Sequence, residues 1–261
     1  TGPLQDSLCL GASTVLIGGV TNQDTVGVQI PSGSFNLGGS YAGLTALPDG
    51  NGVQYQSPIT ISGFPNDAEI QSDQDLNQIC ITMEHSYLGD LEIWLQCPNG
   101  SIVELVNSYS GGIGSLPGGN SGGSIFLGDP IDVTTPGTPG VGWEYCFSSV
   151  FNDVGPMTDN FTNFPVTNTI IAPIENMPSM DPNIVYEPED PFGATLAGCP
   201  VNGDWTIFVV DNISADDGYI FEWGLFFDPS FFAGTGSYQT YVDTSWWNDD
   251  PTIVSGQNDT S

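Results

Sequence analysis

Two segments of the chain each consist of an alternating apolar run, a short polar turn and a second alternating run. They read ICITMEHSYLGDLEIWLQCPNG at 79–100 and NGDWTIFVVDNISADDGYIFEWGLFF at 202–227. Such alternation is typical of strands that bury one face. Each segment therefore predicts a pair of strands joined as a hairpin. No long segment has helical periodicity, so the sequence predicts an all-β fold.

The charge of the chain limits its partners. Its 261 residues include 31 Asp and Glu but neither Lys nor Arg. Nucleic acid and anionic membranes are excluded as partners, because both are bound through cations. The carboxylates must be spread apart, screened by salt or neutralised by metal ions. Three explanations for the missing basic residues stay open: adaptation to a salty or calcium-rich exterior, resistance to proteases, and trimming at flanking basic sites.

The cysteines predict an oxidising environment. No CxxC occurs, and the single histidine, His85, cannot complete a zinc site of the usual spacing. We expect two disulfides and one spare cysteine. Cys80 and Cys97 flank the first predicted hairpin and could bridge it, which would leave Cys146 with Cys199 and Cys9 unpaired. By alternation, however, Cys80 points away from the apolar face that Cys97 shares, so this pairing needs a bulge, and a different pairing would avoid it.

Turn signals and composition divide the chain into three parts. Residues 1–46 are expected to form an N-terminal β arm, residues 47–230 the main sandwich, and residues 231–261 a linker and the start of a further β-module or a C-terminal arm. Within the sandwich, Pro-rich residues 152–200 are expected to be a long surface excursion with at most a helical turn. The run from residue 53 predicts four paired or inward-facing side chains: Val53, Tyr55, Ile59 and Ile61.

Particular positions in the two repeated segments resemble the P domain, or homo B module, found behind subtilisin-like proprotein convertases. In the first segment these positions are His85, Tyr87, Gly89, Asp90, Leu91, Ile93, Leu95, Pro98 and Gly100. In the second they are Asn202, Gly203, Trp205, Asp211, Gly218, Trp223, Gly224 and Leu225. The resemblance covers roughly residues 45–228, apart from a long insertion at 150–198. The wording is most similar to P-domain-like segments of large surface proteins of Bacteroidota, exported by the type IX route and followed by Ig-like or PKD-like repeats.

This resemblance implies a non-catalytic jelly-roll β-sandwich. The motif residues also have a simple structural explanation. His85, Tyr87 and Gly89 would fix the geometry of the first turn, and Trp205 and Trp223 would pack the two sheets together.

Catalytic readings of the chain are weak. GGNSGGS at 118–124 places Ser121 in a Gly-rich loop, but His85 is the only candidate base and lies in the first predicted hairpin. No pair of carboxylates stands out as the acid and nucleophile of a glycosidase. The sequence therefore predicts that the protein is not an enzyme.

Calcium is the predicted cofactor. Ca²⁺ takes several oxygen ligands from carboxylates and loop carbonyls, and acid-rich turns occur at 128–132 and 211–217. The resemblance also implies calcium in such loops, although solvated turn acids on a highly acidic surface explain them equally well. The candidate ligands are Asp90, Asp129, Asp132, Asp211, Asp216 and Asp217.

These features predict an extracellular, secreted structural module of a cell-surface adhesin or filament. Its partners would be protein: further copies or neighbouring β-modules, with residues 1–46 pairing with a neighbour's edge strand. One alternative is a carbohydrate-binding module that holds a glycan through Tyr241, Trp246 and Trp247. Another is an accessory P domain of a secreted subtilisin-like protease.

Overall fold

The computed structural model describes residues 2–3, 16–17, 24–26, 37–48, 53–109, 125–131, 138–161, 165–166, 178–214, 216–232 and 237–239. The chain forms two compact units. Residues 36–233 are the larger unit, and residues 1–35 with 234–261 are the smaller one.

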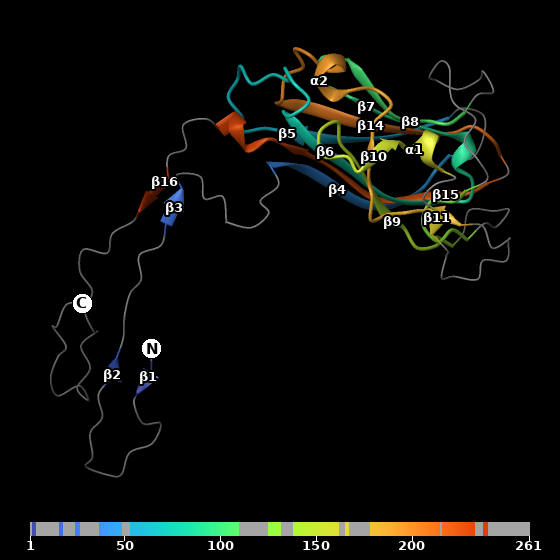
Figure 1. The fold of residues 1–261 in the computed structure, drawn as a ribbon, viewed down its shortest axis with the longest axis horizontal. Helices are drawn as coiled ribbons and strands as arrows, with labels where there is room; N and C mark the ends of the chain where they lie inside the picture. The colour runs from blue at the N-terminus through green and yellow to red at the C-terminus, as the bar shows by residue number, and fades with distance from the viewer. Residues whose placement is uncertain are drawn as a thin grey trace, which may run out of the picture. The chain divides into compact units, whose positions relative to one another are not determined.

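The larger unit is an all-β sandwich built on eight antiparallel strands (Figure 1). One layer has the order β4-β15-β6-β9, and the other has the order β5-β14-β7-β8. Counted along the chain from one to eight, the strands therefore lie as 1-8-3-6 and 2-7-4-5, which is jelly-roll connectivity. This confirms the predicted fold class. The eight strands are β4 (Leu37–Ala46), β5 (Gln54–Ile61), β6 (Leu76–His85), β7 (Leu91–Gln96), β8 (Ile102–Asn107), β9 (Trp143–Phe147), β14 (Gly203–Asp211) and β15 (Gly218–Phe227).

The sequence predicted that each of the two repeated segments forms a hairpin, and this prediction is wrong. β6 and β7 belong to different sheets, and so do β14 and β15. Each segment is an arch that carries the chain from one layer to the other. The first arch contains the short 3-10 helix η1 (Leu88–Asp90). Apolar alternation is the same in a hairpin and an arch, because both need strands with one buried face.

The predicted boundary at residue 46 is wrong. β4 pairs with β15 from Leu37↔Phe227 to Ala46↔Tyr219 and is the edge strand of its sheet. The larger unit therefore begins near residue 36. The polar, Gly-rich composition of β4 resembles that of an arm because the strand buries little: none of the side chains at 38–46 is fully buried.

The Pro-rich insertion is part of the fold rather than a surface excursion. Its strands β10 (Val154–Pro156) and β13 (Val185–Glu187) extend the layer of β9 to six strands through parallel pairing. Two of its prolines, Pro156 and Pro191, directly precede the helices α1 (Met157–Asn160) and α2 (Phe192–Thr195). A separate antiparallel pair joins β11 (Pro165–Val166) to β12 (Ser179–Met180). Apolar residues of the insertion reach the core, among them Met157, Met180, Tyr186, Phe192 and Leu196.

The core lies between the two layers and follows the predicted alternation along most strands. In β5, Tyr55, Ile59 and Ile61 are buried as predicted, whereas Val53 lies before the strand and is 54% exposed. The indole N–H of Trp205 donates to the Val201 carbonyl at 2.9 Å. Both Trp205 and Trp223 are buried in the core, as predicted.

A second small apolar cluster lies on the other face of the four-stranded sheet. Trp94 of β7 and Phe208 of β14 stack with ring centroids 5.1 Å apart, next to Val210. These side chains alternate with the core-facing residues of the same two strands.

The smaller unit contains two short antiparallel pairs. β1 (Gly2–Pro3) pairs with β2 (Leu16–Ile17), and β3 (Asp24–Val26) pairs with β16 (Ser237–Gln239). The larger unit ends in the 3-10 helix η2 (Pro229–Phe232). Cys9, Ser121, Asp132, Tyr241, Trp246 and Trp247 lie outside the described residues, so their predicted roles stay predictions. In the described part of the chain, no helix is long and apolar enough to cross a membrane.

Candidate metal centre

The two arches meet at one end of the sandwich. β6 ends at His85, which pairs with Gly218 at the start of β15, and β14 ends at Asp211, which pairs with Leu91 at the start of β7. The arches are also joined by hydrogen bonds. The Asn212 N–H and side-chain amide both donate to the Asp90 carbonyl, at 3.2 and 2.9 Å. The register of four core strands therefore fixes which side chains meet at this end.

His85, Asp90 and Asp211 form a buried cluster there. His85 Nδ1 lies 3.8 Å from Asp90 Oδ1, and His85 Nε2 lies 3.3 Å from Asp211 Oδ2. The three side chains are at most 1% exposed. One atom from each lies within 4.8 Å of the other two, close enough to share one ion.

The backbone selects the tautomer of His85. The Tyr87 N–H donates to His85 Nδ1 at 3.0 Å, so Nδ1 acts as an acceptor and carries no proton. A neutral His85 then carries its proton on Nε2, which faces Asp211 Oδ2. A nitrogen that carries a proton cannot bind a metal, so His85 orients Asp211 instead of acting as a ligand.

Two buried carboxylates face this single imidazole. Burial by itself would lower the pKa of His85, but the fields of Asp90 and Asp211 outweigh it and raise the pKa to about 9. Burial is also the main cause that raises the pKa of Asp90 to about 7, and Asp211 and Asp216 add to it. The backbone contact at Nδ1 opposes protonation of His85, because an imidazolium would place two N–H donors against each other. Even a protonated His85 would set one positive charge against two carboxylates, so the arrangement lacks a full counter-charge of its own.

Several oxygens at this end have no hydrogen-bond donor in the described part of the chain. They are both carboxylate oxygens of Asp90 and the side-chain oxygen of Asn212, while Asp211 Oδ2 has only the 3.3 Å contact with His85 Nε2. Buried carboxylate oxygens without donors are costly unless a cation neutralises them. Because His85 is excluded as a ligand, the donor set consists of oxygens, which favours a hard cation such as Ca²⁺ over Zn²⁺.

The predicted calcium ligands are only partly brought together. Asp90 and Asp211, from different arches, share the cluster, and Asp216 lies close enough to raise the pKa of Asp90. Asp217 lies in the second arch, and its backbone N–H donates to Ser86 Oγ at 3.0 Å. Asp129 is elsewhere, in a backbone bridge with Val141. His85 was not among the residues that the sequence predicted for the metal site. Its position at the end of a strand, shortly before Asp90, was the signal that could have indicated it.

The other motif residues support the same end of the fold. Gly89 is buried within η1, and Tyr87 precedes that helix and holds His85 through its N–H. The roles predicted for these positions in fixing the first turn stay predictions.

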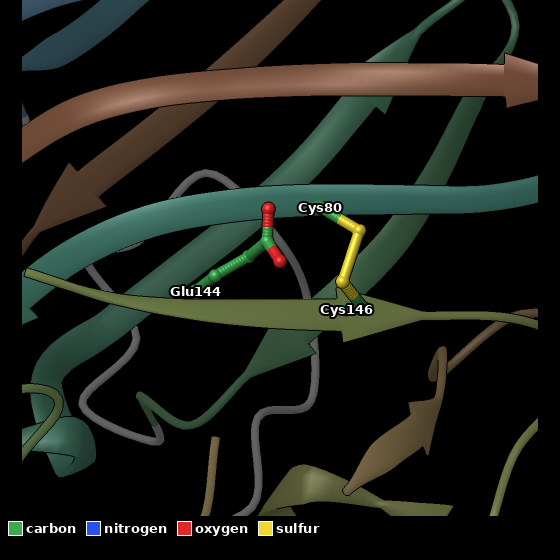
Figure 2. Close-up of side chains that lie close together, drawn as sticks. All are labelled: Cys80, Glu144 and Cys146. Carbon is green, nitrogen blue, oxygen red and sulfur yellow. A yellow bond between two sulfur atoms is a disulfide. The ribbon is translucent and has the colours of Figure 1, made fainter. Parts of the chain in front are cut away.

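A second close group of potential ligands, Cys80, Glu144 and Cys146, contains a disulfide. Cys80 of β6 and Cys146 of β9 face each other directly in the sheet and are bonded. Figure 2 shows the bond between the two strands, with Glu144 extending from β9 on the same side. Both sulfurs are consumed by the disulfide, so this group offers no thiolate to a metal.

The disulfides correct the pairing considered from sequence. All four candidate cysteines are bonded, but Cys80 pairs with Cys146 and Cys97 with Cys199. Cys80 and Cys97 could not bridge a hairpin because their strands lie in different layers. Alternation correctly placed Cys97 on the apolar face, where it lies in the core with Cys199, while Cys80 lies outside that core.

No protein-family model and no curated protein matches the chain. The similarity to the P domain therefore depends on the sequence motifs named above.

Proposed function

We propose that this chain is a non-catalytic structural module of an extracellular surface adhesin or filament, with its fold secured by two disulfides and by Ca²⁺ at Asp90 and Asp211. Its partners are proteins, namely further copies or neighbouring β-modules. The P-domain-like motifs and the jelly-roll connectivity support this proposal, as do the disulfides, which persist in oxidising surroundings.

One observation carries the calcium part of the proposal. Two buried carboxylates share one imidazole whose Nδ1 already accepts a backbone N–H. A divalent cation between Asp90 and Asp211 would supply the missing positive charge and would leave His85 neutral. In a chain without Lys or Arg, no side chain other than His85 can do so.

A structural role also fits the place of the cluster. The cation would join the first arch to the second, and these arches connect the same two layers. Binding would therefore stabilise the sandwich as a whole, because a ligand that binds only the folded state adds its binding free energy to folding.

Thermal unfolding with calcium and with a chelator tests the proposal. At calcium about 100-fold above the dissociation constant, the gain is about 2.7 kcal/mol, or about 5–10 °C in Tm. Asp90→Asn should abolish the calcium response and should raise the Tm in chelator, since it removes one uncompensated buried charge. Glu222→Gln removes the same charge from an exposed position of β15 and should keep the full response.

The calcium part fails if the wild-type Tm is the same in calcium and in chelator. It also fails if Asp90→Asn and Glu222→Gln respond equally to calcium, because a general screening of negative charge would then explain the effect.

A further inference from the structure

The acidic residues are unevenly distributed over the jelly roll. β4 and β5 contain no Asp or Glu, whereas every other strand of the eight contains at least one. The acidic residues in the other six are Glu84, Glu92, Glu104, Glu144, Asp204, Asp211 and Glu222. Between residues 25 and 66 the only acidic residue is Asp49.

The two uncharged strands lie at the same lateral edge of the sandwich. β4 is the last strand of one layer and β5 the first of the other. They are in contact across the core, since a side chain at Gly39 of β4 would collide with Ile59 and Ile61 of β5. We call this edge, formed by Leu37–Ala46 and Gln54–Ile61, the uncharged edge.

Three of the four edge strands are protected against pairing with another chain. β5 carries Pro58, which cannot donate a ladder hydrogen bond. β8 is covered by Asp190, whose N–H donates to the Glu104 carbonyl and whose carboxylate accepts the Glu104 N–H, both at 3.2 Å. β10 is three residues long and ends in Pro156. Short strands, prolines and charges are the devices that block edge-to-edge pairing.

β4 has none of these protections. It is ten residues long, contains neither proline nor charge, and pairs within the described residues only with β15. Tyr41 and Leu44 on this strand are 39% and 56% exposed. A long, uncharged edge strand with exposed apolar side chains is a template for pairing with a further strand.

We infer that β4 pairs in antiparallel fashion with β4 of a second copy of this chain, so that two six-stranded layers join into one continuous sheet. This inference deepens the proposed function, because it names the surface by which the module would assemble. Such a two-fold interface is self-complementary, and each strand supplies the other's missing hydrogen-bond partners.

Charge argues against a basic partner at this edge and leaves two copies one surface at which they can meet. Each copy carries a formal charge of −31 and has no cation with which to attract the other. Two copies can therefore meet at low electrostatic cost only through the surface that lacks carboxylates. A basic partner would instead be drawn to the acidic strands, away from the uncharged edge.

The two faces of the sheet restrict the register. Core-facing residues must stay on the core side in both copies, so a residue pairs with one an even number of positions away. A register centred on Tyr41, with Tyr41 opposite Tyr41 of the second copy, satisfies this condition. Residues that oppose each other have Cα atoms about 4.5–5.5 Å apart, within reach of a disulfide.

Sedimentation of the full chain tests the inference. We expect a dimer whose dissociation constant falls as NaCl is raised, because salt screens the repulsion between the copies. The double variant A42E/L44E places charges on exposed positions of β4 and should weaken the dimer about tenfold or more. Ile102→Glu adds a charge at a residue of β8 that is 38% exposed. Because β8 is the edge strand opposite β5 in its layer, this variant should leave the dimer unchanged.

Cross-linking tests the register in a Cys9→Ser background. Under oxidation, Tyr41→Cys should give a disulfide-linked dimer, whereas Val53→Cys, which is exposed next to β5, should give no disulfide link between the copies. Circular dichroism and the calcium-dependent Tm show whether each variant is folded.

Several outcomes would overturn the inference: a monomer at every concentration and salt, a dimer that A42E/L44E leaves intact, or pairing that captures only strands of other proteins. A monomer that still responds to calcium refutes the pairing of β4 and leaves the proposed calcium site standing. A dimer whose Tm does not respond to calcium refutes the calcium site and leaves the pairing of β4 standing.

Discussion

At the scale of single residues, one hydrogen bond joins the two layers through the core. The indole N–H of Trp223 in β15 donates to Ser57 Oγ in β5 at 3.0 Å. Trp223 is 1% exposed and Ser57 is 3% exposed, so neither group has water as an alternative partner. This explains why a polar residue occupies an inward position of β5, where alternation alone would predict an apolar one.

We expect Ser57→Ala to destabilise the sandwich by about 1–3 kcal/mol, because it leaves the buried indole donor unsatisfied. Urea denaturation would measure the loss. Thr60→Ala is the matched control on the same strand, since Thr60 donates to Asp204 at 2.6 Å in an exposed position and should cost much less. Equal effects of the two substitutions would show that the contact to Trp223 has no special weight.

The sequence carried part of this information. Alternation predicted the burial of Tyr55, Ile59 and Ile61, since the period of a strand is local. It could not predict the cluster of His85, Asp90 and Asp211, because Asp211 is more than a hundred residues away from the others along the chain. Only the pairing of β14 with β7 brings these groups together.

At the scale of elements, the arches show why a strand pattern does not define a sheet. β6 and β7 each bury one face, and the pattern is unchanged whether they pair with each other or face each other across the core. The disulfides follow from that difference. Cys80 faces a neighbour in its own sheet, whereas Cys97 reaches the core-facing Cys199 next to β14.

The two disulfides should differ in their resistance to reduction. Loop closure gives both a similar entropic effect of about 4–5 kcal/mol, since they span 66 and 102 residues. Access separates them, because Cys97 and Cys199 are buried in the core and Cys146 is partly exposed. We expect a thiol reductant under native conditions to reduce the Cys80–Cys146 disulfide first. Alkylation of the released thiols and peptide mass spectrometry would show which cysteines react. Earlier alkylation of Cys97 or Cys199 would contradict the burial argument.

At the scale of the whole molecule, the absence of basic residues leaves the carboxylates to repel one another. The three described carboxyl groups with clearly shifted pKa values, Asp90, Glu104 and Glu189, are all shifted upward. Burial is the largest cause in each case, and neighbouring acids add to it. The jelly-roll order of the strands was predicted from the resemblance and not from the strand pattern. Strands that pair in space, such as β4 and β15, are the first and the last of the eight along the chain.

These upward shifts predict that chelator-treated protein is more stable at about pH 5 than at about pH 8. A carboxyl group with a raised folded-state pKa binds its proton more tightly when folded. Its contribution is complete below the unfolded value, 4.5 for Glu104 and Glu189, and is lost as the pH rises through the folded-state value. Glu189→Gln keeps an oxygen that can accept from Thr158 but does not titrate, so it should reduce this pH dependence.

Denaturant unfolding at the two pH values, at about 0.15 M salt, would measure both slopes. Thr60→Ala, which leaves every carboxyl group in place, is the control and should keep the wild-type slope. If stability instead falls from pH 8 to pH 5, the loss of hydrogen bonds to carboxylates on protonation outweighs the relief of their repulsion. Charge repulsion would then not limit the stability of this fold. If Glu189→Gln keeps the full slope, the buried Glu189 is not one of the groups responsible.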